Sequence, residues 1–256
     1  MLHSHYDKAR VARYFARAAH SYTQHDGLQR QIAELLLAKL QPTCGVLLDV
    51  GCGPAHHAPA LRGTAGQYIG LDIAPTMLEV AQQSQPGDWL LADMERLPLT
   101  NESVACLHSN LAMQWANDNA VLLREWHRVL AANGQLLAST VLAGSMWPLN
   151  ECFAEVDGAV RHNRWLTAEV LQQHLELLPW QASSSVLQVT QAYPSVTAML
   201  RDLKGIGANY TARTQASYLG RQRLAQLEQV MEQYRNDAGM LPLRWQIGLV
   251  QARKQA

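Results

Sequence analysis

Short apolar runs alternate with amphipathic stretches between residues 46 and 140 of the chain. The runs predict five strands, at residues 46–50, 68–73, 89–92, 104–108 and 136–140. The stretches between them predict helices, one starting at Pro75 and another at 120–130 that the pair Asn133-Gly134 ends. Strands that alternate with helices at this pitch form βαβ units, so we expect an α/β fold with a mostly parallel sheet and helices on both faces.

The segments on either side of this region have different patterns. Ahead of it, apolar residues at helical spacing predict two helices that Pro42 closes: Val11, Phe15, Ala18 and Tyr22 in the first, and Leu28, Ile32, Leu35 and Leu36 in the second. After it, the pattern predicts a mostly helical stretch at 144–180 with Thr167 as an N-cap, a strand at 186–193, helices at 194–204 and 221–235, and a closing strand around 243–249. The sheet should therefore have seven strands. We divide the single domain into an N-terminal helical segment (1–42), a core (43–141) and a C-terminal part of helices and closing strands (142–256).

Composition narrows the class of protein. Hydrophobic residues make up 48 % of the 256, and 21 basic residues balance 21 acidic ones, so we expect no general attraction to nucleic acid or to anionic membranes. No apolar run approaches the roughly 20 residues that span a bilayer, and the N-terminus has no apolar secretory signal. The four cysteines are widely spaced and lack a CxxC pair, which favours a reducing cytoplasm.

A glycine loop follows the first predicted strand. Gly51 and Gly53 lie where a strand turns into a helix, and glycine there allows close approach of the backbone to a ligand. Asp72 ends the second strand, at the distance where an acid reaches ribose hydroxyls, and Asp93 ends the third. Ala55 occupies the position of the third glycine of a dinucleotide site, and a Gly-Lys-Ser/Thr motif is absent. The loop therefore suits a ligand with ribose and adenine but no phosphate, although an ordinary βα turn remains the alternative.

Four motifs together resemble the class I S-adenosylmethionine-dependent methyltransferases: "LLDVGCGPA", "GLDI", "LLADMERLPL" and "LREWHRVLAANGQLLAS", which span about residues 45–141. The resemblance implies a Rossmann-like fold. It also implies that Asp72 binds both ribose hydroxyls, that Asp93 accepts from the adenine amino group, and that Asp49 lies near the amino-acid end of the cofactor. The full cofactor-binding set that it implies is Tyr22, Asp49, Gly51, Cys52, Gly53, Asp72, Ile73, Met77, Asp93, Met94 and Asn110.

Three further stretches narrow the resemblance: "FARAAHSYTQHDGLQRQ" (15–31), "SNLAMQW" (109–115) and "LRDLKGIGA" (200–208). With them, nearly the whole chain is similar to the malonyl-acyl-carrier-protein O-methyltransferases of biotin synthesis. That family takes S-adenosyl-L-methionine as methyl donor, releases S-adenosyl-L-homocysteine, and esterifies the free carboxylate of malonyl-acyl-carrier protein. Ala55 departs from the glycine that is usual there. The alternatives are a methyltransferase for another small carboxylic acid or for a ring carbon, and a catalytically silent cofactor-binding module.

The implied reaction needs little catalytic machinery. A carboxyl group with a pKa near 4 is already ionised at neutral pH, so no general base is required, and the motif loops contain no convincing one. Catalysis then consists of positioning the carboxylate and excluding water. Because carboxylate and sulfonium neutralise each other in the transition state, basic residues should orient the substrate and not activate it.

The resemblance also suggests where this chemistry takes place. Residues 1–42 would form a lid in which Tyr22 closes over the cofactor, and Asn110 and Gln114 would lie near the transferred methyl group, so these three are the candidate catalytic residues. Trp115, Arg201 and Lys204 are the candidate substrate-binding residues, the last two sharing a helix face. The alternatives are core packing for Tyr22 and Trp115, and a solvated face for the basic pair.

We expect no metal site and a monomer. The adjacent His56 and His57 point in different directions on a helix, and neither an H-E-x-x-H motif nor a Cys/His cluster occurs in the sequence.

Overall fold

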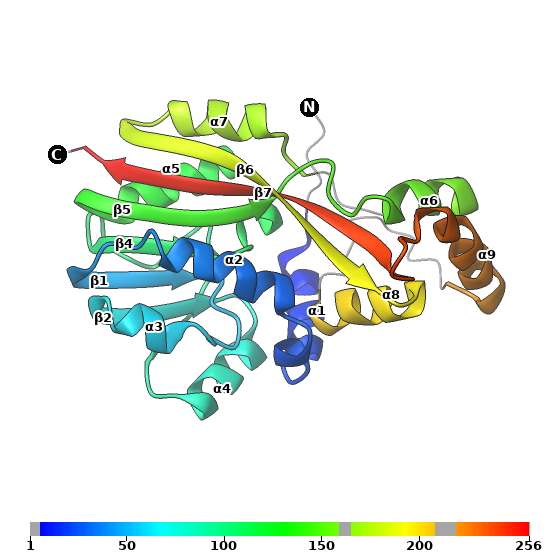
Figure 1. The fold of residues 1–256 in the computed structure, drawn as a ribbon. Coiled ribbons are helices and arrows are strands. Elements are labelled where there is room, and N and C mark those ends of the chain that lie inside the picture. The colour runs from blue at the N-terminus through cyan, green and yellow to red at the C-terminus, as the bar shows by residue number, and fades with distance from the viewer. Residues whose placement is uncertain (1–5, 159–164, 208–218, 256) are drawn as a thin grey trace.

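The fold is built on one seven-stranded sheet (Figure 1). The structure is a computed structural model that describes residues 6–158, 165–207 and 219–255. Its strands are β1 (Thr43–Val50), β2 (Ala65–Asp72), β3 (Asp88–Leu91), β4 (Val104–Ser109), β5 (Leu130–Val141), β6 (Trp180–Tyr193) and β7 (Leu241–Lys254), in the order β3-β2-β1-β4-β5-β7-β6. Only β7 runs antiparallel to its neighbours β5 and β6 in this sheet. The expected mostly parallel seven-stranded sheet is confirmed.

Helices cover both faces of the sheet. They are α1 (Lys8–Ala18), α2 (Gly27–Leu37), α3 (Ala58–Arg62), α4 (Pro75–Ser84), α5 (Asn119–Val129), α6 (Leu149–Asp157), α7 (Ala168–Glu176), α8 (Val196–Gly205) and α9 (Arg221–Met231), with short 3₁₀ turns η1 (Tyr22–Gln24), η2 (Met113–Trp115) and η3 (Glu232–Tyr234). In Figure 1, α2 and α3 lie in front of the sheet, while α5 and α7 pack together in the core on its other face. The carboxyl ends of the parallel strands point to the right of that view, toward α1 and α8.

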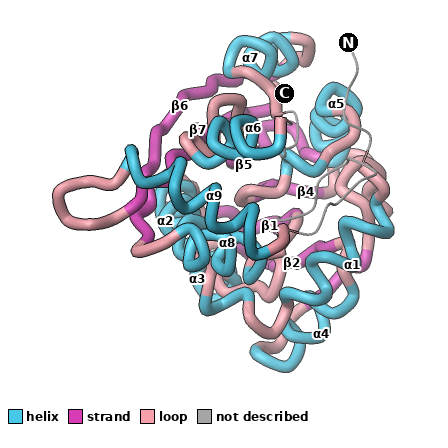
Figure 2. Tube along the Cα trace, turned by 90° about the vertical axis from the view of Figure 1, so that its right-hand side faces the viewer, coloured by secondary structure: helices cyan, strands magenta, loops and turns pink. Residues whose placement is uncertain are grey.

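Beyond these strand ends, the long antiparallel pair of β6 and β7 continues past the last β5 partner, Val141. Its outer part forms a second core with α6, α8 and α9. Figure 2 faces this end and shows α1 and α8 on either side of the ends of β1 and β2. The cap of α8 and α9 and the N-terminal helix α1 therefore flank the sheet edge where parallel α/β folds bind their ligands.

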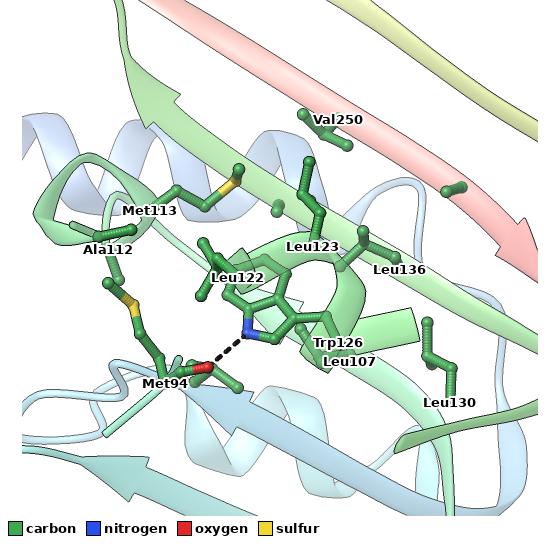
Figure 3. Packing of buried hydrophobic residues seen from close by; sticks show 14 of the residues in the cluster. Met94, Leu107, Ala112, Met113, Leu122, Leu123, Trp126, Leu130, Leu136 and Val250 are labelled. Carbon is green, nitrogen blue, oxygen red and sulfur yellow. Dashed lines mark hydrogen bonds between the residues drawn. The ribbon is translucent and has the colours of Figure 1, made fainter. Parts of the chain in front are cut away.

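Trp126 occupies the centre of the main core. Its side chain is fully buried among leucines of α5, β4 and β5 (Figure 3). Its indole Nε1–H donates to the carbonyl oxygen of Met94 at 3.2 Å, which fixes the loop after β3 to the core. A buried Trp needs such an acceptor, and here it positions a loop at the ligand-binding edge.

The structure corrects three details of the sequence prediction. Tyr22 does not lie on the first helix: α1 ends at Ala18, where the Ser21 hydroxyl donates to the Ala18 carbonyl, and Tyr22 begins η1. The pair Asn133-Gly134 does not end α5, which stops at Val129. It lies inside β5, where Asn133 has φ +60° and β5 advances from 130 to 135 while β4 advances from 104 to 106.

The third correction concerns the C-terminal part. The strand expected at 186–193 begins at Trp180, because its polar serines pair with β7 as fully as its apolar residues do. The stretch expected to be mostly helical contains α6 and α7, with the Thr167 hydroxyl accepting from Val170 N–H as the predicted N-cap. Residues 159–164 between these helices lie outside the described residues.

Candidate active site

The loop after β1 requires glycine at position 51. Gly51 has φ +71°, and a Cβ there would lie 2.5 Å from that of Ala112. Gly53 has φ +55°, and its N–H donates to Asp72 Oδ2 at 2.9 Å. A side chain at 51 would therefore push the β1 loop away from the loop after β4.

Asp72 joins two loops at the end of β2. Its Oδ2 accepts from Gly53 N–H, and its Oδ1 accepts from Ala74 N–H at 2.8 Å. Burial raises the pKa of this carboxyl to about 6, although the backbone donors oppose the shift. Each carboxylate oxygen has a second lone pair, so Asp72 can still accept bonds from a ligand hydroxyl.

A first chamber opens beside Asp72, with about 650 Å³ of empty space including its mouth. This size is typical of small-molecule sites, roughly 300–1,000 Å³. Its lining combines apolar side chains with a few polar groups: Lys8, Val11, Phe15, Tyr22, Gly51, Gly53, Leu71, Asp72, Ile73, Met77, Ala92, Asp93, Met94, Asn110, Leu111, Ala112 and Trp115. Of the cofactor-binding set proposed from the sequence, Asp49 and Cys52 lie outside this chamber.

The N-terminal helix α1 covers the first chamber. Phe15 and Tyr6 contact the ring of Trp115 edge-on, with centroids 5.3 and 5.5 Å apart. Lys8 forms ion pairs with Asp93, at 3.1 Å, and with Glu95. A ligand group that bonds to the Asp93 side chain would therefore share its carboxylate with Lys8.

The turn after α1 is tied to α8 by polar contacts. His25 Nδ1 lies 2.8 Å from Asp202 Oδ1, and Tyr193 donates to Asp202 Oδ2 at 2.7 Å. The Ser21 hydroxyl donates to the Gly205 carbonyl at 3.3 Å. A Cβ at Gly205 would lie 2.0 Å from the His25 ring, so the "LKGIG" stretch needs a glycine where α8 meets this turn.

Asn110 and Gln114 shape the loop after β4. Asn110 lines the chamber, donates to the Gln29 carbonyl at 2.8 Å and accepts from the Ser139 hydroxyl at 2.9 Å. Gln114 donates to the Leu111 carbonyl at 2.6 Å and accepts from Val141 N–H at 3.4 Å. Its side chain therefore stabilises the loop through these backbone contacts and lines neither chamber described here.

A second chamber of about 420 Å³ adjoins the first and shares Tyr22, Gly51 and Asn110 with it. Its other lining residues are Asp26, Gln29, Asp49, Cys52, Pro54, His56, His57 and His108. Burial raises the pKa values of the Tyr22 hydroxyl and the Cys52 thiol, while burial lowers that of His57. Tyr22 and Cys52 therefore stay protonated and His57 neutral at physiological pH.

Sequence patterns did not predict the two acid–histidine pairs of this chamber, in which both acids and His108 are buried and His56 is partly exposed. Asp49 Oδ1 lies 2.8 Å from His108 Nδ1, and Asp26 Oδ2 lies 2.9 Å from His56 Nδ1. The parallel register pairs Asp49 with His108, so the two side chains share one face of the sheet. This register was the only available signal, because the two residues are 59 positions apart.

Arg201 and Lys204 lie on the exposed face of α8 and line neither chamber. Asp202, between them in sequence, faces inward to His25 and Tyr193. Ala208, the last residue of the 200–208 motif, lies outside the described residues. In the part of the chain that the structure describes, no group of three or more His, Cys, Asp or Glu side chains could hold a metal ion. No helix described there is long and apolar enough to cross a bilayer.

Comparison with known proteins shows which class of enzyme has this fold. A family model described as "Methyltransferase domain" matches residues 48–138. The YcgJ protein from Bacillus subtilis has a similar fold, with a TM-score of 0.63, 17 % identity, and coverage of 89 % of this chain and 99 % of that one. So does a geranyl diphosphate C-methyltransferase from Streptomyces coelicolor in complex with S-adenosyl-L-homocysteine (TM-score 0.54, 12 % identity, 88 % and 76 % coverage). The fold is that of the Rossmann-like methyltransferases.

Curated relatives narrow the class further. A malonyl-[acyl-carrier protein] O-methyltransferase from Yersinia pestis is 36 % identical over 242 residues, which cover 93 % of this chain and 89 % of that protein. A biotin biosynthesis bifunctional protein from Saccharophagus degradans is 30 % identical over 99 % of this chain and 48 % of its own length. The chain belongs to the malonyl-[acyl-carrier protein] O-methyltransferase family, which confirms the resemblance found in its motifs.

The contact between Gly205 and His25 generates a prediction. In Gly205→Ala the new methyl group must displace the His25 ring, which Asp202 holds, so we expect a loss of about 1–3 kcal/mol in the free energy of unfolding. The N-terminal segment should also be cleaved faster in limited proteolysis. Urea unfolding measures the first effect.

Gly63→Ala is the matched control, because Gly63 also ends a helix and has φ −62°. A Cβ at Gly63 would lie 3.4 Å from its nearest neighbour, the Ala60 carbonyl oxygen, so the added methyl group displaces no side chain. Equal stability of the two variants would show that α8 does not hold the turn through the Gly205–His25 contact.

Proposed function

We propose that the protein transfers a methyl group from S-adenosyl-L-methionine to the free carboxylate of malonyl-acyl-carrier protein, giving the methyl ester that starts pimeloyl chain synthesis for biotin. The observation that carries this proposal is the 36 % identity to the Yersinia pestis enzyme over 93 % of the chain. Such coverage cannot be confined to the cofactor-binding core and must include much of the C-terminal part, where substrate-side elements lie in our division of the chain.

The residues of the first chamber fit the cofactor. Asp72 presents free lone pairs at a chamber wall, as ribose hydroxyls require, and the β1 loop lacks the third glycine of a pyrophosphate site. When bound, the cofactor supplies an electrophilic methyl group on a sulfonium. We assign the adenine to the apolar region around Ile73, Met77 and Met94.

The residues of this chain position the reacting groups and exclude water from them. Tyr22 and Cys52 remain protonated, so neither acts as a base, and an ionised carboxylate acceptor needs none. Tyr22 and Asn110 stand at the boundary of the two chambers and would orient the reacting groups there. Gln114 would act through the Leu111 loop, and Phe15 and Trp115 would keep water out.

Arg201 and Lys204 are exposed, which favours contact with the carrier over contact with the malonyl carboxylate. A carrier protein with an acidic surface would meet them through screened, long-range attraction. The described residues of one chain line both chambers, so the proposal requires only a monomer. The four free cysteines agree with a place in the reducing cytoplasm.

Labelled S-adenosyl-L-methionine tests the proposed reaction. The protein should transfer label to malonyl-acyl-carrier protein and not to acetyl-acyl-carrier protein, which differs by the free carboxylate. In Arg201→Ala/Lys204→Ala, kcat/KM should fall for the carrier-bound substrate but not for a short malonyl thioester. Equal labelling of both carrier proteins, or labelling of neither, would refute the proposed acceptor.

The pKa of Asp72 predicts the pH dependence of cofactor binding. With a pKa of about 6, the carboxylate is ionised at pH 7.5 and largely protonated at pH 5, so its bonds to ribose hydroxyls lose their charge assistance as the pH falls. The affinity for S-adenosyl-L-homocysteine, measured by calorimetry, should drop by about fivefold over this range.

The control for this prediction is Asp72→Asn, which should bind more weakly at both pH values and show a smaller pH effect. If that variant had the same pH profile as the wild type, another group would be responsible.

A further inference from the structure

Two buried polar atoms at the second chamber have no hydrogen-bond partner among the described residues: His108 Nε2 and Gln29 Oε1. The His108 side chain is only 2 % exposed. Leaving a buried polar atom unpaired is energetically costly. Two such atoms among the lining residues of one chamber point to a polar ligand that supplies their missing partners.

The surroundings of His108 define which kind of bond it can make. Its Nδ1–H donates to Asp49 Oδ1 at 2.8 Å, and the Tyr68 hydroxyl donates to Asp49 Oδ2 at 2.9 Å. In the tautomer with its proton on Nδ1, the ring presents Nε2 as an acceptor. Asp49 is itself buried and is held by the Tyr68 hydroxyl, so it fixes the orientation of the His108 ring.

The other groups of the chamber also favour a donor ligand. The described lining contains neither Lys nor Arg. His56 is paired with Asp26, and burial lowers the pKa of His57, which keeps that ring neutral. Gln29 adds a carbonyl-type acceptor from α2, and its backbone oxygen holds Asn110 at the boundary with the first chamber. A primary ammonium group matches this set of acceptors.

We propose that His108 Nε2 and Gln29 Oε1 accept hydrogen bonds from the α-ammonium group of the methyl donor, and that Asp49 is a positioning residue that fixes the His108 tautomer. This inference rests on the proposed function, because the ligand of the first chamber then extends past Gly51 into the second. Asp49, which the resemblance places near the amino-acid end of the cofactor, then orients the residue that makes the contact.

Replacing His108 by two different amides separates this role from a purely structural one. In His108→Asn, the amide stands where Nδ1 was and keeps the bond to Asp49 but loses the acceptor. In His108→Gln, the amide oxygen stands near the place of Nε2 and keeps the acceptor. Binding by calorimetry is measured with S-adenosyl-L-homocysteine and with its analogue in which hydrogen replaces the α-amino group.

The proposal expects His108→Asn to bind S-adenosyl-L-homocysteine about tenfold more weakly or worse, since the lost bond involves a charged donor, and to bind the deamino analogue almost as the wild type does. His108→Gln should recover part of the loss. Gln29→Leu should show the same selectivity, which keeps the test available if a His108 variant does not fold. His127→Asn is the control: its Nε2 is also buried without a hydrogen-bond partner among the described residues, but His127 packs against Trp180 and lines neither chamber.

Two results distinguish the possible failures. If the wild type binds S-adenosyl-L-homocysteine but His108→Asn and Gln29→Leu bind both ligands like the wild type, or lose both equally, the inference is wrong and the proposed function stands. If the wild type binds neither ligand, the proposed cofactor fails and the inference fails with it.

Discussion

The buried carboxylate of Asp72 is the constraint on which the site depends. It accepts one backbone N–H from the loop after β1 and one from the loop after β2, so two neighbouring loops are held at a fixed separation. Burial works against its charge and raises its pKa to about 6. Removing the charge of Asp72 would avoid the cost of burying it, but would weaken the hydrogen bond that holds the glycine loop. Because Gly51 of this loop lines both chambers, the shape of both depends on that bond.

The N-terminal segment is attached to the strand ends and to α8 by both apolar and polar contacts. Lys8 reaches Asp93 and Glu95 at one end of α1, and His25 reaches Asp202 on α8 just beyond the other. Partly exposed ion pairs such as those of Lys8 contribute little stability each, typically about 0–1 kcal/mol. In the proposed function this segment acts as a lid that excludes water during methyl transfer and opens to release a product bound to a carrier.

Sequence patterns predicted the parts of the molecule that depend on local chemistry. The apolar runs located β1, β2 and β4, and the glycine loop with Asp72 indicated a ribose-binding site without phosphate. The first half of β6 is rich in polar serines, so the apolar pattern did not predict it as a strand. A turn stabilised by Ser21 ends the first helix before Tyr22, so Tyr22 does not lie in the helix predicted for it. The pairs Asp49–His108 and His25–Asp202 join residues 59 and 177 positions apart, so only strand register and tertiary packing bring them together.

In the proposed function one ligand occupies both chambers, with its ribose at Asp72 and its amino-acid end beside His108. A crystal structure of the protein with S-adenosyl-L-homocysteine would show this arrangement. Both ribose hydroxyls should lie within hydrogen-bond distance of the Asp72 carboxylate, and the α-ammonium nitrogen within hydrogen-bond distance of His108 Nε2. A ribose that does not touch Asp72, or an amino-acid end that points away from the second chamber, would contradict it.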